Sequence, residues 1–209
     1  MNADEMMKRI DEASPRFKAR IAAVLYFLSL LTAILGESVG GSVGFAAGEM
    51  AVAGMAAMTL LLYDIFKPVN RSLSLLAASF NLVGLGFEAF RLNPRGVDIA
   101  LVFVGFHHLL IGYLIFKSNF LPRILGALMA IGGLAWLTYV SPPLANYLSP
   151  YNTASGLVGE GSVFLWLLVM GVNVERWKEQ ASARRERQGE LPSAGHSGSR
   201  TLSKSRTSL

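Results

Sequence analysis

Long apolar stretches alternate with short polar segments along most of this chain. A hydrocarbon core is crossed by about 20 helical residues, and these stretches have about that length without the alternation of apolar and polar residues found in membrane strands. The pattern therefore predicts an all-α fold, a polytopic membrane protein built as a six-transmembrane-helix bundle. The predicted spans are Ile21–Gly36, Val43–Phe66, Leu73–Phe90, Val97–Phe116, Leu121–Val140 and Thr153–Val172.

Proline and capping residues mark several of the predicted helix ends. Ser14 followed by Pro15 is typical of a cap and a first helical residue. Pro68 is expected to end the second helix, because a proline removes a backbone donor and clashes with the preceding turn. The pair Pro142 and Pro143 is expected to stop the fifth helix in the same way.

Positive charge falls mainly on one side of the predicted spans. Of the 19 Lys and Arg residues, only Arg91 and Arg95 fall on the opposite side. Because cytoplasmic loops are rich in Lys and Arg, both termini are predicted to be cytoplasmic in a bacterial inner membrane. We expect residues 1–20 to form a cytoplasmic segment, residues 21–174 the membrane domain and residues 175–209 a basic, mostly disordered cytoplasmic tail.

The basic tail also bears on the expected partners. Near a membrane surface, Arg184, Arg185 and Arg187 would each gain about 1 kcal/mol from anionic lipid. The alternative is a solvated tail that does not bind lipid and whose positive charge only sets the orientation of the protein in the membrane. The sequence pI near 9.7 does not predict nucleic-acid binding, because the basic residues lie at span ends and in the tail. The predicted partners are the lipid bilayer and anionic lipid.

Motifs that would identify a reaction are missing from the sequence. There is no Cys, which excludes thiolate metal and redox chemistry. No nucleotide loop, zinc-protease motif or nucleophile elbow is present. The sequence therefore predicts no catalytic residue, no resident metal and no cofactor, and favours a protein that is not an enzyme.

Polar residues inside the predicted spans carry the functional signal. An ionisable group at mid-membrane costs about 2.5–3.5 kcal/mol on insertion scales, so it needs a partner, water or a neutral form. The second, third, fourth and sixth spans could bring such residues to one polar pocket in the outer half of the bilayer. Acids and imidazoles together suit a proton relay, a cation site or a divalent metal site. The candidates are Glu49, Asn81, Glu88, His107, His108 and Glu160.

Some candidates have a structural explanation and others do not. Glu88 is followed one turn later by Arg91. An ion pair between the two would explain an acid at this position as well as a functional site would. Adjacent residues of a helix project about 100° apart, so His107 and His108 face different neighbours. Glu160 has no basic residue within two turns of its helix, which makes it the strongest candidate.

Small residues predict close helix contacts in the fourth span. His108 shares a face with Gly105 and Gly112. Glycines on one face let two membrane helices approach closely. Helical facing therefore favours His108 over His107 as the histidine that points into the bundle.

Several segments resemble one family of bacterial membrane proteins. They include Tyr63–Leu76, the Phe-Leu-Pro-Arg-Ile-Leu-Gly run that ends at Gly126, and Gly159-Glu160 ahead of Leu165-Trp166. Over roughly Arg16 to Val174 the chain resembles the family called domain of unknown function 4386. The resemblance implies six helices in a bacterial inner membrane and no known activity. It also implies a histidine at His107 and a glutamate at Glu160, which shifts the preferred histidine to His107, and an arginine where this chain has Asn81.

Three functions remain open from the sequence. The first is a small transport or ion- or proton-coupled protein, with Glu160 as the acceptor, His107 as its relay and Glu88 nearby. The second is a non-catalytic sensor, accessory or assembly module, whose polar residues only pair with one another. The third is a membrane metalloenzyme with His107 and carboxylate ligands, which the small number of histidines disfavours.

Overall fold

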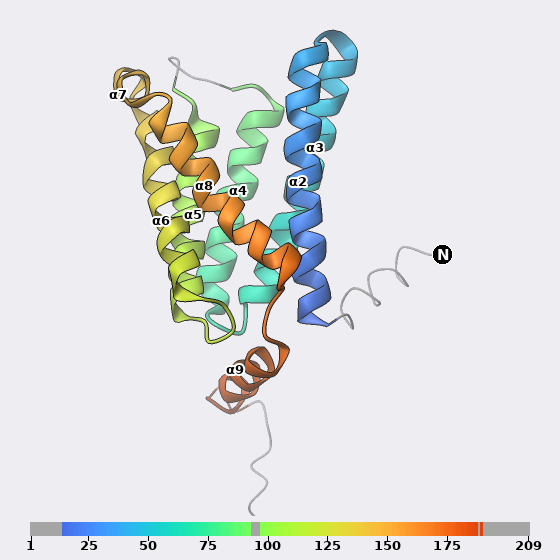
Figure 1. Ribbon diagram of the computed structural model, residues 1–209, viewed down its shortest axis with the longest axis vertical. Coiled ribbons are helices and arrows are strands. Elements are labelled where there is room, and N and C mark those ends of the chain that lie inside the picture. Colours follow the sequence, from blue (N-terminus) through green and yellow to red (C-terminus); the bar gives the residue numbers. More distant parts are fainter. Residues whose placement is uncertain (1–13, 93–96, 188, 190–209) are drawn as a thin grey trace, which may run out of the picture.

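The computed structural model describes residues 14–92, 97–187 and 189, and this part of the chain contains helices and no strand. Six long helices form the body of the protein, and shorter elements lie at its two ends (Figure 1). The elements are α2 (Pro15–Val39), α3 (Gly41–Phe66), α4 (Arg71–Ala89), α5 (Ile99–Lys117), α6 (Arg123–Leu137), the 3-10 turn η2 (Thr138–Val140), α7 (Pro142–Leu148), α8 (Tyr151–Val169) and α9 (Val174–Arg187).

The six long helices close into a ring. Each packs against two neighbours, in the order α2, α3, α4, α5, α6, α8 and back to α2. In Figure 1, α8 runs obliquely across the bundle, with α7 at one end and α9 at the other. We refer to these ends as the α7 end and the α9 end. The ring leaves a shared interior to which all six helices present side chains.

Length and composition identify the protein as a multi-pass membrane protein. Helices α2 to α5 are each long and apolar enough to cross a membrane, as is α6 taken together with the 3-10 turn η2. Helix α8 reaches this standard together with α9, to which it is joined at a bend of 104°. Large apolar side chains such as Leu28, Leu31 and Leu60 are exposed on the outer surface, which is typical of a lipid-facing bundle. The predicted helical membrane fold is confirmed, with five or six spans.

Glycines set the contact between α5 and α6. A Cβ on Gly112 would lie 2.8 Å from the carbonyl oxygen of Gly126, and one on Gly126 would lie 2.7 Å from that of Gly112. Gly105 and Gly133 form a second reciprocal contact, at 2.9 Å in each direction. No side chain fits at these four positions without moving a backbone. The face predicted for close contact is therefore used for it.

The helix ends follow the predicted signals, with one correction. Ser14 caps α2 by accepting from the amide of Phe17, and α3 ends just before Pro68. The fifth spanning helix, however, ends at Leu137, ahead of the prolines that were expected to stop it. Pro142 instead opens α7, because the first turn of a helix needs no donor from that residue.

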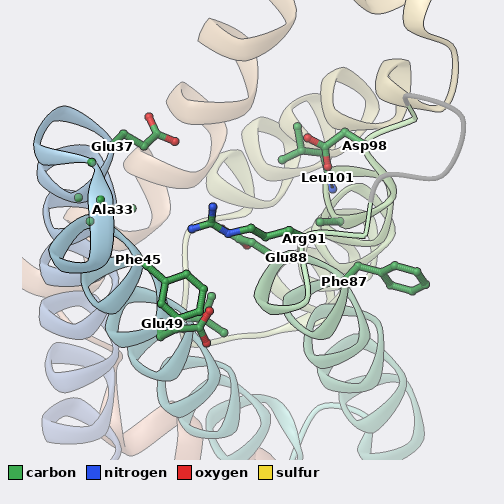
Figure 2. Close-up of a pocket in the computed structure, with 16 residues that line it drawn as sticks. Ala33, Glu37, Phe45, Glu49, Phe87, Glu88, Arg91, Asp98 and Leu101 are labelled. Atoms are coloured by element: carbon green, nitrogen blue, oxygen red, sulfur yellow. Dashed lines mark hydrogen bonds between the residues drawn. The ribbon is translucent and has the colours of Figure 1, made fainter.

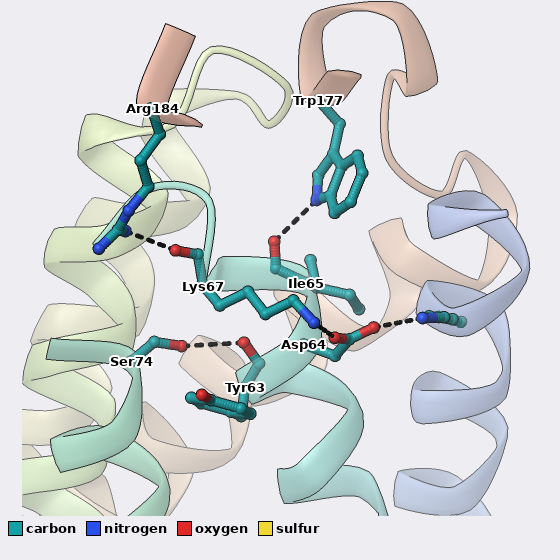
Figure 3. Close-up of polar contacts among 8 residues, drawn as sticks. Tyr63, Asp64, Ile65, Lys67, Ser74, Trp177 and Arg184 are labelled. Atoms are coloured by element: carbon teal, nitrogen blue, oxygen red, sulfur yellow. Dashed lines mark hydrogen bonds and ion pairs between the residues drawn. The ribbon is translucent and has the colours of Figure 1, made fainter. Parts of the chain in front are cut away.

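Helix α9 occupies the first part of the segment 175–209, for which a mostly disordered tail was predicted. The chain is helical through Arg187, and the remainder of the predicted tail lies outside the described residues, except Gly189. Side chains of α9 donate to carbonyls at the ends of α3 and α5, where helices leave acceptors unsatisfied. Figure 3 shows two of the acceptor–donor pairs, Ile65 with Trp177 (2.8 Å) and Lys67 with Arg184 (2.5 Å). The other two are Lys117 with Gln180 (3.4 Å) and Asn119 with Arg176 (3.3 Å).

An ion-pair cluster holds the same end of the bundle. Asp64, near the end of α3, pairs with Lys67 of the following turn and with Lys18 of α2 (Figure 3). The hydroxyl of Ser74 donates to the carbonyl of Tyr63 over 3.1 Å. The two lysine partners of Asp64 give it a structural role at the α9 end.

Candidate functional site

Glu160 lies at the middle of α8 and joins four helices. Its Oε1 accepts a hydrogen bond from Nε1 of Trp136 on α6 over 2.6 Å, and its Oε2 accepts one from the hydroxyl of Tyr26 on α2 over 2.9 Å. Nε2 of His108 on α5 lies 2.9 Å from Oε1. The Glu160 residue is only 9% exposed. A carboxylate this deeply buried requires such partners.

Packing fixes the two aromatic donors. The Tyr26 ring stacks on Phe164, with ring centroids 4.1 Å apart and planes inclined by 10°. Trp136 lies against Gly156 of α8, where a Cβ would collide with the indole. Because glycine and a stacked ring define these positions, both polar hydrogens are held toward the same carboxyl group.

The contact between His108 and Glu160 requires a bound proton. Nδ1 of His108 lies 2.6 Å from the carbonyl oxygen of Val104, and a carbonyl only accepts, so Nδ1 carries a hydrogen. If His108 were neutral and Glu160 ionised, lone pairs would face one another across 2.9 Å. One proton must therefore lie on either Nε2 or the carboxyl group, and in both cases the pair has no net charge.

The alignment of this contact is imperfect. It has the separation of an ion pair, but Nε2 of His108 is a buried nitrogen without a hydrogen bond of good geometry in the described residues. The aromatic donors of Trp136 and Tyr26 hold the carboxyl group in place, whereas Nε2 of His108 has only a close contact with it. Such a contact is weaker than the two aromatic hydrogen bonds.

A central cavity of about 220 Å³ lies beside the carboxyl group. It is large enough for several water molecules. Apolar side chains such as Leu85, Val104 and Met129 form much of its wall. Its polar wall comes from Tyr26, Ser29, Asn81, Glu88, His107, His108, Trp136 and Glu160.

Two of the polar residues have only part of their hydrogen-bonding capacity satisfied. Nδ1 of His107 lies 2.9 Å from the carbonyl oxygen of Ala77, and Nδ2 of Asn81 donates to the hydroxyl of Thr59 over 2.6 Å. Thr59 in turn donates to the carbonyl of Met55. This leaves Nε2 of His107 and Oδ1 of Asn81 without a partner in the described part of the chain.

A second, acidic pocket of about 560 Å³ lies at the α7 end, between α2, α3, α4 and α5 (Figure 2). Its carboxylates are Glu37, Glu49, Glu88 and Asp98. Four residues line both this pocket and the central cavity, namely Ala33, Val52, Glu88 and Leu101. The two spaces therefore share a wall in which Glu88 is the ionisable residue.

Arg91 crosses the acidic pocket. Its guanidinium extends toward the Phe45 ring (Figure 2) and lies 5.0 Å from the centroid of that ring. No ion pair joins Arg91 to Glu88 within the described residues. Arg91 has a φ of 51°, at a helix C-terminus where glycine is usual. The predicted alternative of an ion pair with Glu88 is thus replaced by a contact between a cation and an aromatic ring.

The structure brings together five of the six predicted site residues. Asn81, Glu88, His107, His108 and Glu160 line the central cavity, whereas Glu49 lines the acidic pocket. The partner of Glu160 is His108, so the choice of His107 as its relay is corrected. The glycine face that carries His108 directs it toward α6 and α8, and His107, about 100° away, faces α4.

Two residues of this cluster escaped the sequence analysis. Tyr26 and Trp136 donate directly to Glu160, but tyrosine and tryptophan in membrane helices are usually interpreted as interfacial anchors. A usable signal exists for Tyr26, which continues a buried face formed by Ala19, Ala22 and Ala23. Gly132 and Gly133 precede Trp136 by about one turn and mark a similarly crowded face.

A metal centre has no obvious place among these residues. In residues 14–92, 97–187 and 189, no three His, Asp or Glu side chains are grouped so as to hold a metal ion. The arrangement instead suits a bound proton, because one carboxyl group and one imidazole share it.

Comparisons with known proteins match the predicted resemblance over part of the chain. The sequence model of the family described as "Domain of unknown function (DUF4386)" matches residues 88–171. This segment contains His107, His108, Trp136 and Glu160. A protein of Archaeoglobus fulgidus, described as an uncharacterized protein, is 27% identical over 125 residues, which cover 54% of this chain and 75% of that protein. No solved structure matches the chain.

Proposed function

We propose that this protein is a small transport protein in which the Glu160–His108 pair binds a proton that is transported or coupled to transport. The observation that carries the proposal is the contact at 2.9 Å between His108 Nε2 and Glu160 Oε1, which requires one proton and borders a cavity. Loss of that proton would leave the unprotonated Nε2 of His108 facing the carboxylate of Glu160. The resulting repulsion would separate α5 from α8.

The position of the pair supports a role in conformational change. Glu160 of α8 accepts hydrogen bonds from α2 and α6 and contacts α5, so four of the helices that close the ring meet at this carboxyl group. A ligand shifts a conformational equilibrium only through different affinities for the two states. The proton is required for the closed contact between His108 and Glu160 but not for the separated state, so its affinity for the two states differs.

We also propose a cytoplasmic membrane location with both termini inside. Lys18, Lys67 and Lys117 and the arginines of α9 lie at the α9 end, whereas Arg91 and four acids lie toward the α7 end. The positive-inside rule then puts the α9 end in the cytoplasm. The exposed arginines Arg176 and Arg185 on α9 would contact anionic lipid there.

The test is proton movement in proteoliposomes that contain the full chain and a pH-sensitive dye. A membrane potential is imposed. Three small solutes that share the same carbon skeleton, namely an ammonium compound, an alcohol and a carboxylate, are then added outside in separate experiments. We expect proton flux above that of protein-free liposomes with at least one solute, lost in Glu160→Gln and kept in the control Gly161→Ala. Flux equal to that of empty liposomes under every condition would contradict the proposal.

A second candidate function rests on a different feature of the same residues. Both oxygens of Glu160 already accept hydrogen bonds, from Trp136 and Tyr26. A carboxylate satisfied in this way could serve only as a structural hub of a non-catalytic membrane module. That function predicts that Glu160→Gln lowers stability without altering any flux, which the same experiment measures.

A further inference from the structure

The central cavity has a polar wall that is incompletely satisfied. His107 and Asn81 are 2% and 5% exposed, and each uses one of its hydrogen-bonding atoms on a neighbouring helix. The fully buried side-chain atom without a hydrogen bond in the described residues is Nε2 of His108. Nε2 of His107 and Oδ1 of Asn81 are instead accessible from the cavity that these residues line, so they indicate what an occupant of the cavity must provide.

Both leftover atoms are acceptors. Nδ1 of His107 faces the carbonyl of Ala77 and so carries the ring hydrogen. No carboxylate lies within ion-pair distance of His107 in the described residues, and an unpaired buried charge is costly, so the ring is neutral and its Nε2 accepts. Asn81 donates through Nδ2 to Thr59, whose own hydrogen goes to Met55, which fixes Oδ1 as the amide acceptor.

The surrounding charges select among possible donors. Glu88 lines the cavity beside the Glu160–His108 pair, which has no net charge, and no Lys or Arg of the described residues lines it. The acidic pocket that shares the Glu88 wall would attract cations from outside. The rest of the cavity wall is apolar, with Leu30, Met55 and Leu101 among its residues. The occupant should thus combine several N–H donors and positive charge with a compact apolar body.

We infer that the central cavity binds a small primary ammonium compound, whose N–H groups donate to His107 Nε2 and Asn81 Oδ1 and whose apolar part lies against Leu, Val and Met side chains. A branched five-carbon amine is within the size that 220 Å³ admits. This inference rests on the proposed transport function for its biological meaning, but binding itself is independent of proton movement.

The experiment uses the purified full chain in detergent and four probes that carry the same isoamyl group and differ in the polar group attached to it. These are isoamylammonium, its N,N,N-trimethyl derivative, isoamyl alcohol and 4-methylpentanoate. Binding is followed by thermal shift and by calorimetry. We expect isoamylammonium to raise Tm and to bind at least about tenfold more tightly than the trimethyl derivative, because that cation lacks N–H donors.

Variants test the two acceptors. His107→Phe and Asn81→Leu are each expected to weaken isoamylammonium binding by about tenfold or more. The control is Ser79→Ala, on the same helix as Asn81, because the Ser79 hydroxyl bonds only to the carbonyl of Leu75 on an exposed face. If His107→Phe does not fold it is replaced by His107→Gln, and if Asn81→Leu does not fold it is replaced by Asn81→Ala, which also removes the amide acceptor.

Three results would overturn the inference. They are equal binding of the trimethyl cation, preferred binding of the carboxylate, and no binding of any probe by folded protein. In the last case the cavity holds water only. Proton flux in proteoliposomes that persists with the alcohol or the carboxylate would then leave the proposed function intact, so the two failures can be distinguished.

Discussion

Nε1 of Trp136 and Oε1 of Glu160 lie 2.6 Å apart, and this hydrogen bond joins α6 to α8 in the interior of the bundle. Hydrogen bonds between membrane helices contribute about 0.6–2 kcal/mol each. Because Tyr26 and His108 contact the same carboxyl group, the loss of one side chain affects three interhelical contacts at once.

Removal of the Glu160 carboxyl group is therefore expected to be costly. Glu160→Leu leaves the Trp136 and Tyr26 hydrogens unsatisfied and should lower the free energy of unfolding by about 2–5 kcal/mol. Glu160→Gln keeps one acceptor and should cost less. Equilibrium unfolding in mixed SDS and detergent measures both variants. A leucine variant as stable as the wild type would show that the three contacts contribute nothing.

The identity of the histidine partner can be tested by double-mutant cycles. Glu160→Gln is combined with His108→Gln and, separately, with His107→Gln. The His108 cycle should give a coupling free energy of about 1 kcal/mol or more, because these side chains are in contact. The His107 cycle should give less, because His107 bonds to Ala77 on α4. Larger coupling for His107 would restore the sequence-based choice.

The glycine contact of α5 and α6 gives a prediction with a matched control. Gly112→Ala would place Cβ 2.8 Å from the Gly126 carbonyl oxygen, and the backbone shift should cost about 1–3 kcal/mol of unfolding free energy. At Gly161 nothing lies within 4 Å of an added Cβ. Gly161→Ala should be neutral or stabilise by about 0.5–1 kcal/mol, since alanine favours a helix. Equal effects at both positions would refute the close crossing.

Orientation can be tested by labelling, because the chain has no native Cys. Tyr147→Cys on α7 replaces a side chain that is 84% exposed, and Lys178→Cys replaces an exposed residue of α9. A membrane-impermeant thiol reagent applied to intact cells should label only the first. Labelling of Lys178→Cys before the membrane is permeabilised would place the α9 end outside.

The sequence predicted best the features that depend on residues close together within one helix. Apolar length and proline positions predicted the spans within a few residues, as α3 (Gly41–Phe66) shows against the predicted Val43–Phe66. The small-residue face of Gly105 and Gly112 also packs as expected. These features depend on neighbours along one helix, so one sequence is sufficient to recognise them.

The rest depends on which helices meet. The spans do not specify the ring order, so the sequence could not show that Tyr26 of α2 and Trp136 of α6 reach Glu160 of α8. It also missed the docking of α9, because that helix is mostly polar and its side chains donate to carbonyls at the end of α3, which a sequence pattern does not show. Pairings across long sequence separations required the structure.

The central claim is that Glu160 and His108 together hold one exchangeable proton. Infrared difference spectroscopy of the reconstituted protein at different pH values detects a proton on the carboxyl group through its C=O stretch, and a proton on the imidazole through the carboxylate and imidazolium bands. We expect a pH-dependent signal of one of these two forms that disappears in Glu160→Gln and shifts in His108→Gln, but persists in Gly161→Ala. A spectrum of Glu160→Gln identical to that of the wild type across the titration would contradict the account.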